Sequence, residues 1–220
     1  MLKIRTNLRK VVAIAICLAG FIVFSGCNKD DKEPLTYDEG VVINGVKWAT
    51  RNVGKPGSFA AKPESTGMLY QWNSKVAWSA TDLAEGVEIT GWNKTWYGGY
   101  EIPSVDDKWQ PTNDPCPVGW RVPTVEELQK LIEINSDWTT INGIMGLLFG
   151  SGENTIFIPA SGARRHSGGQ FESDPSGYWS ISSVFDEYRA SFLIFGDNEN
   201  ATISDAGMRG NAMCIRCVAK

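Results

Sequence analysis

The sequence is poor in histidine and in basic residues. Its 220 residues include one His, at position 166, and 21 Lys and Arg against 25 Asp and Glu, for a formal net charge of −4. A single His excludes metal sites built from several histidines and leaves one candidate for histidine-based catalysis. Because phosphate binding needs clustered Lys and Arg, the acidic balance argues against nucleic acid as a partner.

The sequence also lacks an apolar run long enough for a comfortable membrane span. Its most apolar segment, residues 11–24, has 14 residues, whereas a spanning helix needs about 20. A basic start without acidic residues precedes it: Lys3, Arg5, Arg9 and Lys10. Ser25-Gly26-Cys27 follows, and the whole resembles a bacterial lipoprotein leader. The resemblance implies that residues 1–26 are removed and that Cys27 carries a lipid anchoring the chain in a membrane. An ordinary secretory signal and an uncleaved anchor are the alternatives.

Removal of the leader makes the remaining chain strongly acidic. It takes away four basic residues and no acidic ones, so 21 basic residues become 17 against 25 acidic, and the net charge moves from −4 to −8. Residues 27–40 are charged and poor in apolar side chains, which predicts a lipidated acidic tether. Residues 29–33 are similar to the surface-export signal of Bacteroidota lipoproteins. That similarity implies an outer-membrane lipoprotein exposed at the cell surface; a plain solvated tether explains the same residues.

Residues 41–220 are predicted to form a single α+β domain with short antiparallel strands, one main helix and long loops. An Asn-Gly pair at 44–45 predicts a hairpin over 41–48. Thr124 and Glu127 have capping-box spacing, which predicts the main helix over about 124–135. A second, weaker helix is predicted over 141–149. Further strands are predicted at 67–72, 156–159, 178–181, 190–195 and 213–218, and loops at 79–113.

Three cysteines remain after the leader and Cys27 are set aside: Cys116, Cys214 and Cys217. An exported location permits disulfides. Positions three apart in a strand face opposite sides, about 10 Å apart, whereas disulfide Cα atoms lie within about 7 Å. We therefore favour a Cys116–Cys217 disulfide that closes a loop of about 100 residues, stabilises the fold by about 4 kcal/mol and leaves Cys214 a buried thiol. A zinc site from the three cysteines and His166 is the less favoured alternative.

Six motifs follow one another along residues 42–218. They are Ile43–Gly54, Gly67–Trp72, Asp114–Thr124, Ile158–Arg164, Gly177–Ser180 and Ile215–Val218. In this order they resemble the FISUMP family (Fibrobacter succinogenes major paralogous domain), which is common among bacterial surface lipoproteins. The resemblance implies a C-type-lectin-like plan, with the first and last strands side by side and long loops on a compact core. The residues of these motifs have structural roles: Trp48, Trp72, Trp120 and Trp179 are expected in the core, and Arg121 and Arg216 are expected to satisfy buried carbonyls or carboxylates.

Aromatic residues also gather in the predicted loops of 79–113, which we call the aromatic segment. They are Trp92, Trp96, Tyr97, Tyr100 and Trp109. Aromatic side chains on loops stack on sugar rings or anchor a protein partner, so these five are the predicted ligand-binding residues. The alternative is that they pack the loop down as a satellite core. Calcium ligands at 106–107 and 197–200 are a less favoured hypothesis.

Catalysis has little support in the sequence. Ser-His chemistry at His166 needs a neighbouring acid to orient the ring, and the local sequence, a basic tip at 164–169, does not supply one. The C-type-lectin-like plan also hosts a formylglycine-generating enzyme family, whose paired active-site cysteines are not evident here. We expect a non-enzymatic surface binding or adhesion protein without a cofactor, whose ligand is a glycan or a surface protein. A structural component of a cell-surface assembly is the alternative, and an enzyme ranks third.

Overall fold

The computed structural model divides the chain into two compact units, residues 1–32 and 33–220. It describes residues 35–80, 106, 108–167, 169–172, 176–184, 186–196 and 200–220, and of 176–184 the backbone only. The predicted signal peptide 1–26, Cys27 and the tether up to residue 34 therefore lie outside the described residues. Within the described ranges, no helix is long and apolar enough to cross a membrane.

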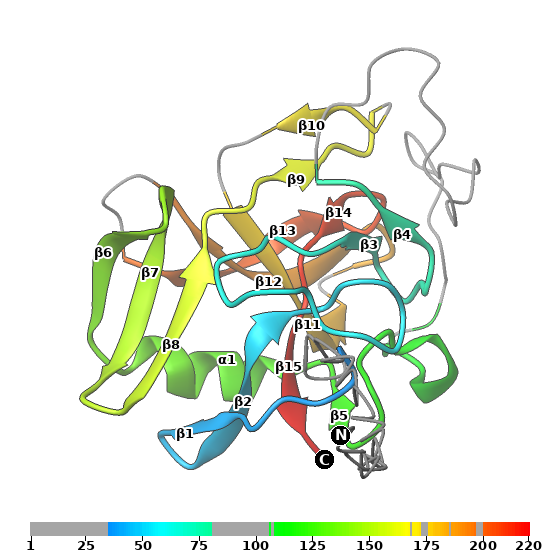
Figure 1. The fold of residues 1–220 in the computed structure, drawn as a ribbon. Helices are drawn as coiled ribbons and strands as arrows, with labels where there is room; N and C mark the ends of the chain where they lie inside the picture. Colours follow the sequence, from blue (N-terminus) through cyan, green and yellow to red (C-terminus); the bar gives the residue numbers. More distant parts are fainter. Residues whose placement is uncertain are drawn as a thin grey trace, which may run out of the picture. The chain divides into compact units, whose positions relative to one another are not determined.

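The described chain is mostly β, with one short α-helix and four small sheets in which every recorded strand pairing is antiparallel (Figure 1). The first, which we call the terminal-strand sheet, has the order β1 (Val41–Ile43), β2 (Val46–Asn52), β15 (Arg216–Ala219) and β5 (Trp120–Arg121). The second, the hairpin sheet, has the order β6 (Ser136–Ile141), β7 (Ile144–Ser151) and β8 (Asn154–Pro159). The third has the order β11 (Ser176–Val184), β12 (Arg189–Phe195) and β13 (Thr202–Met208). The fourth has the order β10 (Phe171–Glu172), β9 (Ala163–Arg164), β14 (Ala212–Met213), β3 (Leu69–Gln71) and β4 (Ala77–Trp78).

The terminal-strand sheet begins with the predicted Asn-Gly hairpin. Asn44 and Gly45 both have positive φ, 46° and 79°, as a two-residue hairpin turn requires, and Ile43 then pairs with Val46. The last strand, β15, lies between β2 and β5, so it neighbours the second strand of the described chain and not the first, β1 (Figure 1). Chain segments more than 160 residues apart are thus joined in one ladder, through the second strand of the first hairpin, whereas the resemblance implied pairing of the first strand itself.

The main helix, α1 (Val125–Ile132), starts where its capping box predicted. The hydroxyl of Thr124 accepts from the Glu127 backbone N–H at 3.2 Å, and the Glu127 carboxylate accepts from the Thr124 N–H at 2.8 Å. The helix ends at residue 132, about three residues earlier than predicted. The N–H of Ile134 bonds the carbonyl of Leu131, a tighter turn that redirects the chain into β6. The apolar face of α1 enters the core through Leu128 and Leu131.

The second helix predicted over 141–149 is wrong: this stretch is the β6–β7 hairpin. Asn142 and Gly143 have φ values of 49° and 83° and form a two-residue turn that pairs Ile141 with Ile144. The second glycine of this stretch, Gly146, leaves room for β8, because a Cβ there would lie 2.3 Å from the carbonyl oxygen of Ile158. The two glycines that weakened the helix prediction are the residues that the hairpin needs.

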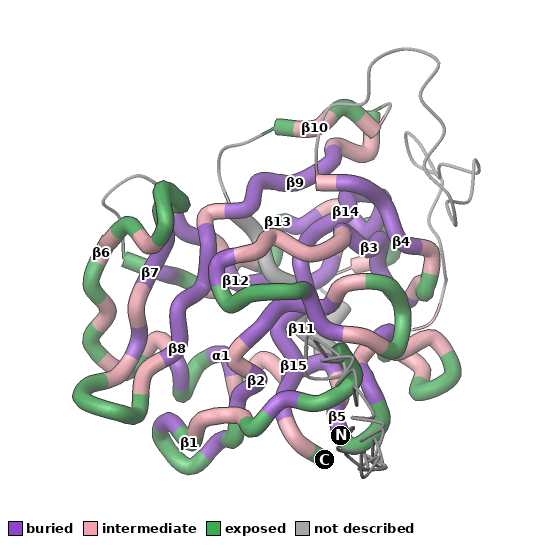
Figure 2. Tube along the Cα trace, viewed as in Figure 1, coloured by how far each residue is buried: buried purple, intermediate pink, exposed green. Residues whose placement is uncertain are grey.

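The buried hydrophobic residues of the described chain fall into two clusters, and buried stretches, purple in Figure 2, run along β2, β8 and β15. Trp48 lies in the first cluster and Trp72 and Trp120 in the second, all less than 9% exposed, as predicted. The predicted Cys116–Cys217 disulfide is present, with Cα atoms 6.1 Å apart. Cys116 lies in the loop before β5 and Cys217 lies in β15, so the disulfide ties that loop to the terminal-strand sheet.

Candidate functional site

Four of the five predicted ligand-binding aromatics, Trp92, Trp96, Tyr97 and Tyr100, lie outside the described residues. The fifth, Trp109, is a core residue and not a surface one. Its side chain is 2% exposed, its indole N–H donates to the carbonyl of Asn113 at 3.0 Å, and its ring meets Trp72 edge-on at 5.4 Å. A ring buried in this way cannot stack on a ligand. For Trp109, the satellite-core alternative describes its position.

The aromatic segment returns to the domain at a turn held by one buried asparagine. Asn73, 3% exposed, has positive φ (51°) and lies just after β3. Its side-chain oxygen accepts from the backbone N–H of Gln110 at 2.7 Å and from the amide of Asn113 at 3.2 Å. Its amide nitrogen donates to the carboxylate of Asp106 at 2.8 Å. The side chain of Asn73 therefore holds three residues of the segment 106–113 in place: Asp106, Gln110 and Asn113.

Two buried arginines complete this attachment. Arg209, 2% exposed, donates to the backbone carbonyl of Asp106 at 3.3 Å and lies over the ring of Trp72, 5.7 Å from its centroid. At the departing end, Arg164 donates to the carbonyl of Ser79 at 2.7 Å. Because each of these two carbonyls accepts from an arginine, both described ends of the aromatic segment have fixed positions.

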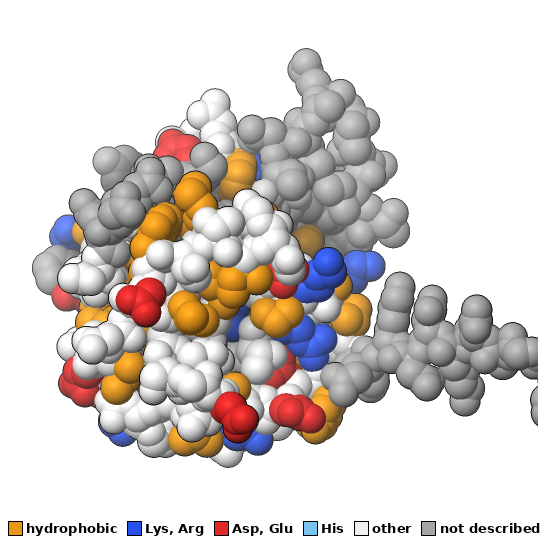
Figure 3. Space-filling model, turned by 60° about the vertical axis from the view of Figure 1, so that its left-hand side comes forward, with side chains coloured by type: hydrophobic (Ala, Val, Ile, Leu, Met, Phe, Trp, Pro, Cys, Tyr) orange, Lys and Arg blue, Asp and Glu red, His pale blue; other side chains and the backbone are white. Residues whose placement is uncertain are grey.

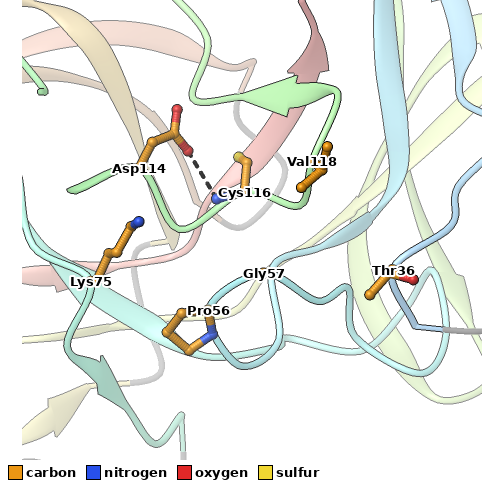
Figure 4. A pocket seen from close by; sticks show the side chains of 7 residues that line it. All are labelled: Thr36, Pro56, Gly57, Lys75, Asp114, Cys116 and Val118. Atoms are coloured by element: carbon orange, nitrogen blue, oxygen red, sulfur yellow. Dashed lines mark hydrogen bonds between the residues drawn. The ribbon is translucent and has the colours of Figure 1, made fainter. Parts of the chain in front are cut away.

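A groove of about 570 Å³ lies beside this attachment. Its lining comes from four separate parts of the chain: Thr36, Pro56, Gly57, Lys75, Asp114, Cys116 and Val118 (Figure 4). Val118 is 98% exposed and Pro56 is exposed, so the groove has accessible apolar contacts. Lys75, from the same β3–β4 turn as Asn73, adds an exposed positive charge. The shape and chemistry suit a ligand with an apolar face and polar edges.

The carboxyl group of Asp114 has a structural role in the wall of the groove. One oxygen accepts from the Cys116 N–H at 2.9 Å, the dashed bond in Figure 4, and the other accepts from the Val122 N–H at 3.1 Å. Burial raises the pKa of Asp114 above its usual value, although these two hydrogen bonds and the charges of Lys220 and Lys75 act in the opposite direction. Asp114 thus holds the disulfide loop in shape, and Lys75 is the charged group of the groove that faces solvent.

His166, the one candidate for histidine-based catalysis, and the remaining thiol, Cys214, have structural partners. The backbone N–H and Nδ1 of His166 lie 2.9 and 3.2 Å from the side-chain oxygen of Asn211. Cys214 is fully buried, and its Sγ lies 3.4 Å from the carbonyl oxygen of Thr66. Neither residue lines the groove.

The described residues bear on both metal hypotheses, zinc and calcium. Among the described residues, no group of three or more His, Cys, Asp or Glu side chains is placed to hold a metal ion. The Cys116–Cys217 disulfide uses two of the three cysteines of the zinc hypothesis, which is therefore wrong. Of the calcium candidates, Asp106 is engaged by Asn73 and Asn200 is exposed, and residues 107 and 197–199 lie outside the described residues.

The predicted role of Arg216 is confirmed, whereas Arg121 pairs with a carboxylate that is only partly buried. Arg216, 1% exposed, donates to the side chain of Asn52 at 2.8 Å and to the carbonyls of Ala49 and Phe157 at 3.1 and 3.0 Å. Arg121 pairs with the Glu127 carboxylate through two bonds of 2.7 and 2.6 Å. Arg216 is thus part of the internal framework, and Arg121 ties β5 to the first turn of α1.

No family model, curated protein or solved structure matches this chain. The groove was not predicted from the sequence, because its lining residues come from segments around positions 36, 56, 75 and 114–118. The one sequence signal that points to it is the Asp-Pro-Cys-Pro run at 114–117, whose prolines and disulfide fix a loop at the surface.

Proposed function

We propose that this chain is a non-enzymatic binding protein of the FISUMP type. Its ligand, a glycan or a surface protein, is bound by the aromatic segment together with the neighbouring groove. The observation that carries the proposal is the Asn73 attachment. Asn73 holds the end of the Trp-rich and Gly-rich aromatic segment on a core that a disulfide cross-links. Asn73 belongs to the same turn as Lys75, which lines the groove. Loops presented by a rigid framework are where binding residues concentrate in proteins.

The proposed location is the outer membrane, with the domain at the cell surface and a lipid on Cys27 as the anchor. The basic and apolar leader with its Ser-Gly-Cys end supports the lipid anchor. The Cys116–Cys217 disulfide supports an oxidising compartment outside the cytoplasm, although weakly. The adjacency of β2 and β15 supports the C-type-lectin-like plan that we propose with the family.

Binding without catalysis is supported by the way in which the domain uses its reactive side chains. His166 is engaged with Asn211, and the Cys214 thiol is buried against a backbone carbonyl. An aromatic segment with four Trp or Tyr rings at 92–100 offers contact area instead, because aromatic rings stack on sugars and anchor protein partners.

The test is binding of the purified chain to glycan and host-protein arrays. We expect saturable binding that falls at least tenfold in Trp96→Ala and in Lys75→Ala. Tyr188→Ala is the matched control, because Tyr188 is 38% exposed and does not line the groove. Thermal unfolding of each variant must match that of the wild type. Binding that is unchanged in both test variants, or lost equally in Tyr188→Ala, would contradict the proposed site.

A further inference from the structure

Among the residues that the structure describes, no strand pairs with the outer side of β6 (Ser136–Ile141), which we call the uncovered edge of the hairpin sheet. The order of the sheet is β6-β7-β8, so β6 has a partner on one side only, and it runs along the outer side of that sheet in Figure 1. The opposite edge is different: the carbonyl of Phe157 in β8 accepts from Arg216, and β8 contacts β1 and β2. An uncovered edge offers unpaired N–H and C=O groups to another strand.

The turn of the β6–β7 hairpin decides which backbone groups face outward. In a two-residue hairpin the flanking residues, here Ile141 and Ile144, exchange both hydrogen bonds, and the pattern then alternates along the strand. The N–H and C=O groups of Ser136, Trp138 and Thr140 therefore point away from β7. Within the described ranges, none of these three residues bonds a further segment through its backbone.

The one charged residue of β6 is the exposed Asp137, and little else in the strand opposes the approach of another strand. It pairs with β7 over all six residues without a bulge, and it contains neither Pro nor Lys, the residues that commonly protect edges. Its shape is also fixed at the turn of the hairpin and within the strand. The turn residue Asn142 donates to the carboxylate of Glu64 at 2.9 Å, and the ring of Trp138 packs edge-on against Phe195 at 6.3 Å. The edge is thus preorganised for pairing.

We propose that β6 is a self-association edge, at which two copies of this chain pair antiparallel to form a continuous six-stranded sheet. The sequence of β6 fits this occupant. When Trp138 faces Trp138 of the other copy, Ser136 faces Thr140, and Asp137 faces Thr139. No like charges are then directly opposed, and all outward N–H and C=O groups of the edge find partners.

The registers shifted by one residue, or by two residues toward the start of β6, fit worse. A shift of the pairing by two residues toward the start of β6 sets Asp137 against Asp137 of the other copy, which is unfavourable. A shift of one residue would bring outward groups opposite groups already used in the hairpin. Figure 3, which turns this side of the molecule forward, shows hydrophobic, uncharged and acidic side chains mixed there. Backbone pairing in one register, and not a large apolar patch, is the basis of this association.

The register makes a cross-linking prediction. Asp137 of one copy and Thr139 of the other form a non-hydrogen-bonded pair with Cα atoms about 4.5 Å apart, within disulfide reach. Two copies of residue 137, or of residue 139, are diagonal neighbours about 7 to 8 Å apart, outside that reach. Full-length Asp137→Cys and Thr139→Cys chains with different tags are coexpressed and oxidised in membranes of the producing cells. We expect the mixed dimer at a yield at least tenfold above either chain alone.

Two sets of controls decide the outcome. Glu153→Cys pairs, at the exposed β7–β8 turn, report random collisions. Thr140→Pro, placed in both cysteine chains, removes an outward N–H and should abolish the mixed dimer, whereas Thr140→Val should preserve it. Unchanged thermal unfolding and an intact Cys116–Cys217 disulfide show that Thr140→Pro still folds. Three results would each overturn the proposal. The yield of mixed dimer could equal that of the Glu153→Cys pairs, it could be unchanged by Thr140→Pro, or the cysteines could cross-link only to other proteins. These readouts do not depend on ligand binding.

Discussion

The terminal-strand sheet and the hairpin sheet are built from opposite kinds of contact. In the first, β15 is joined to β2 across more than 160 residues, Cys217 is bonded to Cys116, and Arg216 ties three distant acceptors together. In the second, β6, β7 and β8 follow one another in sequence through two short turns. The comparison teaches that long-range contacts close the domain, whereas local pairing creates a sheet that keeps an edge available.

The largest effect is expected from removing the disulfide of the terminal-strand sheet. A Cys116→Ala/Cys217→Ala double variant should lose about 4 kcal/mol of unfolding free energy, because the unfolded chain regains the freedom of a loop with a sequence separation of 101. Denaturant unfolding measures the loss, and reduction of the wild type should produce a similar one. A loss below about 1 kcal/mol would mean that the sheet closes without its cross-link.

The next effect tests the buried cation of the same sheet. Arg216→Met should cost about 3 kcal/mol, because the side-chain oxygen of Asn52 and two backbone carbonyls lose their donor in the core. The matched control is Arg165→Met. Arg165 pairs with Glu172 at the surface and should change stability by less than about 0.5 kcal/mol. Equal losses in both variants would show that burial does not determine how much each arginine contributes to the free energy of unfolding.

A smaller effect belongs to the hairpin sheet. Gly146→Ala should cost about 2 kcal/mol, because its Cβ would lie 2.3 Å from the carbonyl oxygen of Ile158 in β8. Gly143→Ala is the comparison, since a Cβ there has no atom within 4 Å and meets only the strain of φ at 83°. That strain is worth about 1 kcal/mol. Thermal unfolding distinguishes the two variants, and the reverse order would contradict the close packing of β7 on β8.

The smallest effect is the pH dependence of the ion pair at the edge of the terminal-strand sheet. Burial raises the pKa of Glu127, but the hydrogen bonds from Arg121 and from the Thr124 backbone outweigh it, so the pKa is lowered overall. A lowered folded-state pKa gives stability that is present above about pH 4.3, the unfolded value, and is lost as the pH falls through the folded value. The wild type should therefore lose about 1 kcal/mol more than Glu127→Gln between pH 7 and pH 3.

Unfolding free energies of the two proteins at both pH values measure this difference. Gln at position 127 can still accept from the Thr124 N–H, so the helix cap is retained while the charge is removed. An equal loss of unfolding free energy in the two proteins between pH 7 and pH 3 would show that the ion pair contributes nothing to stability.

The sequence predicted the elements whose signals are local. The Asn-Gly pair at 44–45 and the capping residues Thr124 and Glu127 act within a few positions of their own element, so hairpin and helix start where expected. The same rule was overlooked at 142–143, where a second Asn-Gly pair makes the hairpin that we predicted as a helix. The polar strand β13 (Thr202–Met208) was also missed, because its order comes from pairing with β12 and not from its own pattern.

The candidate site was less predictable than the fold. Aromatic residues of the segment 79–113 looked alike in the sequence, but Trp109 is packed on Trp72 in the core. The anchoring residues Asn73 and Arg209 had no motif to mark them, because each works by reaching a segment more than 30 residues away.

The sequence by itself determined the Cys116–Cys217 pairing, the β1–β2 hairpin, the start of the main helix and the structural use of the motif arginines. Spacing and side-chain chemistry were sufficient there, since few partners were compatible with each residue. Tertiary structure alone decided the groove beside Lys75, the buried place of Trp109 and the uncovered edge of β6. A groove or an edge is defined by which segments become neighbours and which do not, and that is fixed only when the whole core packs.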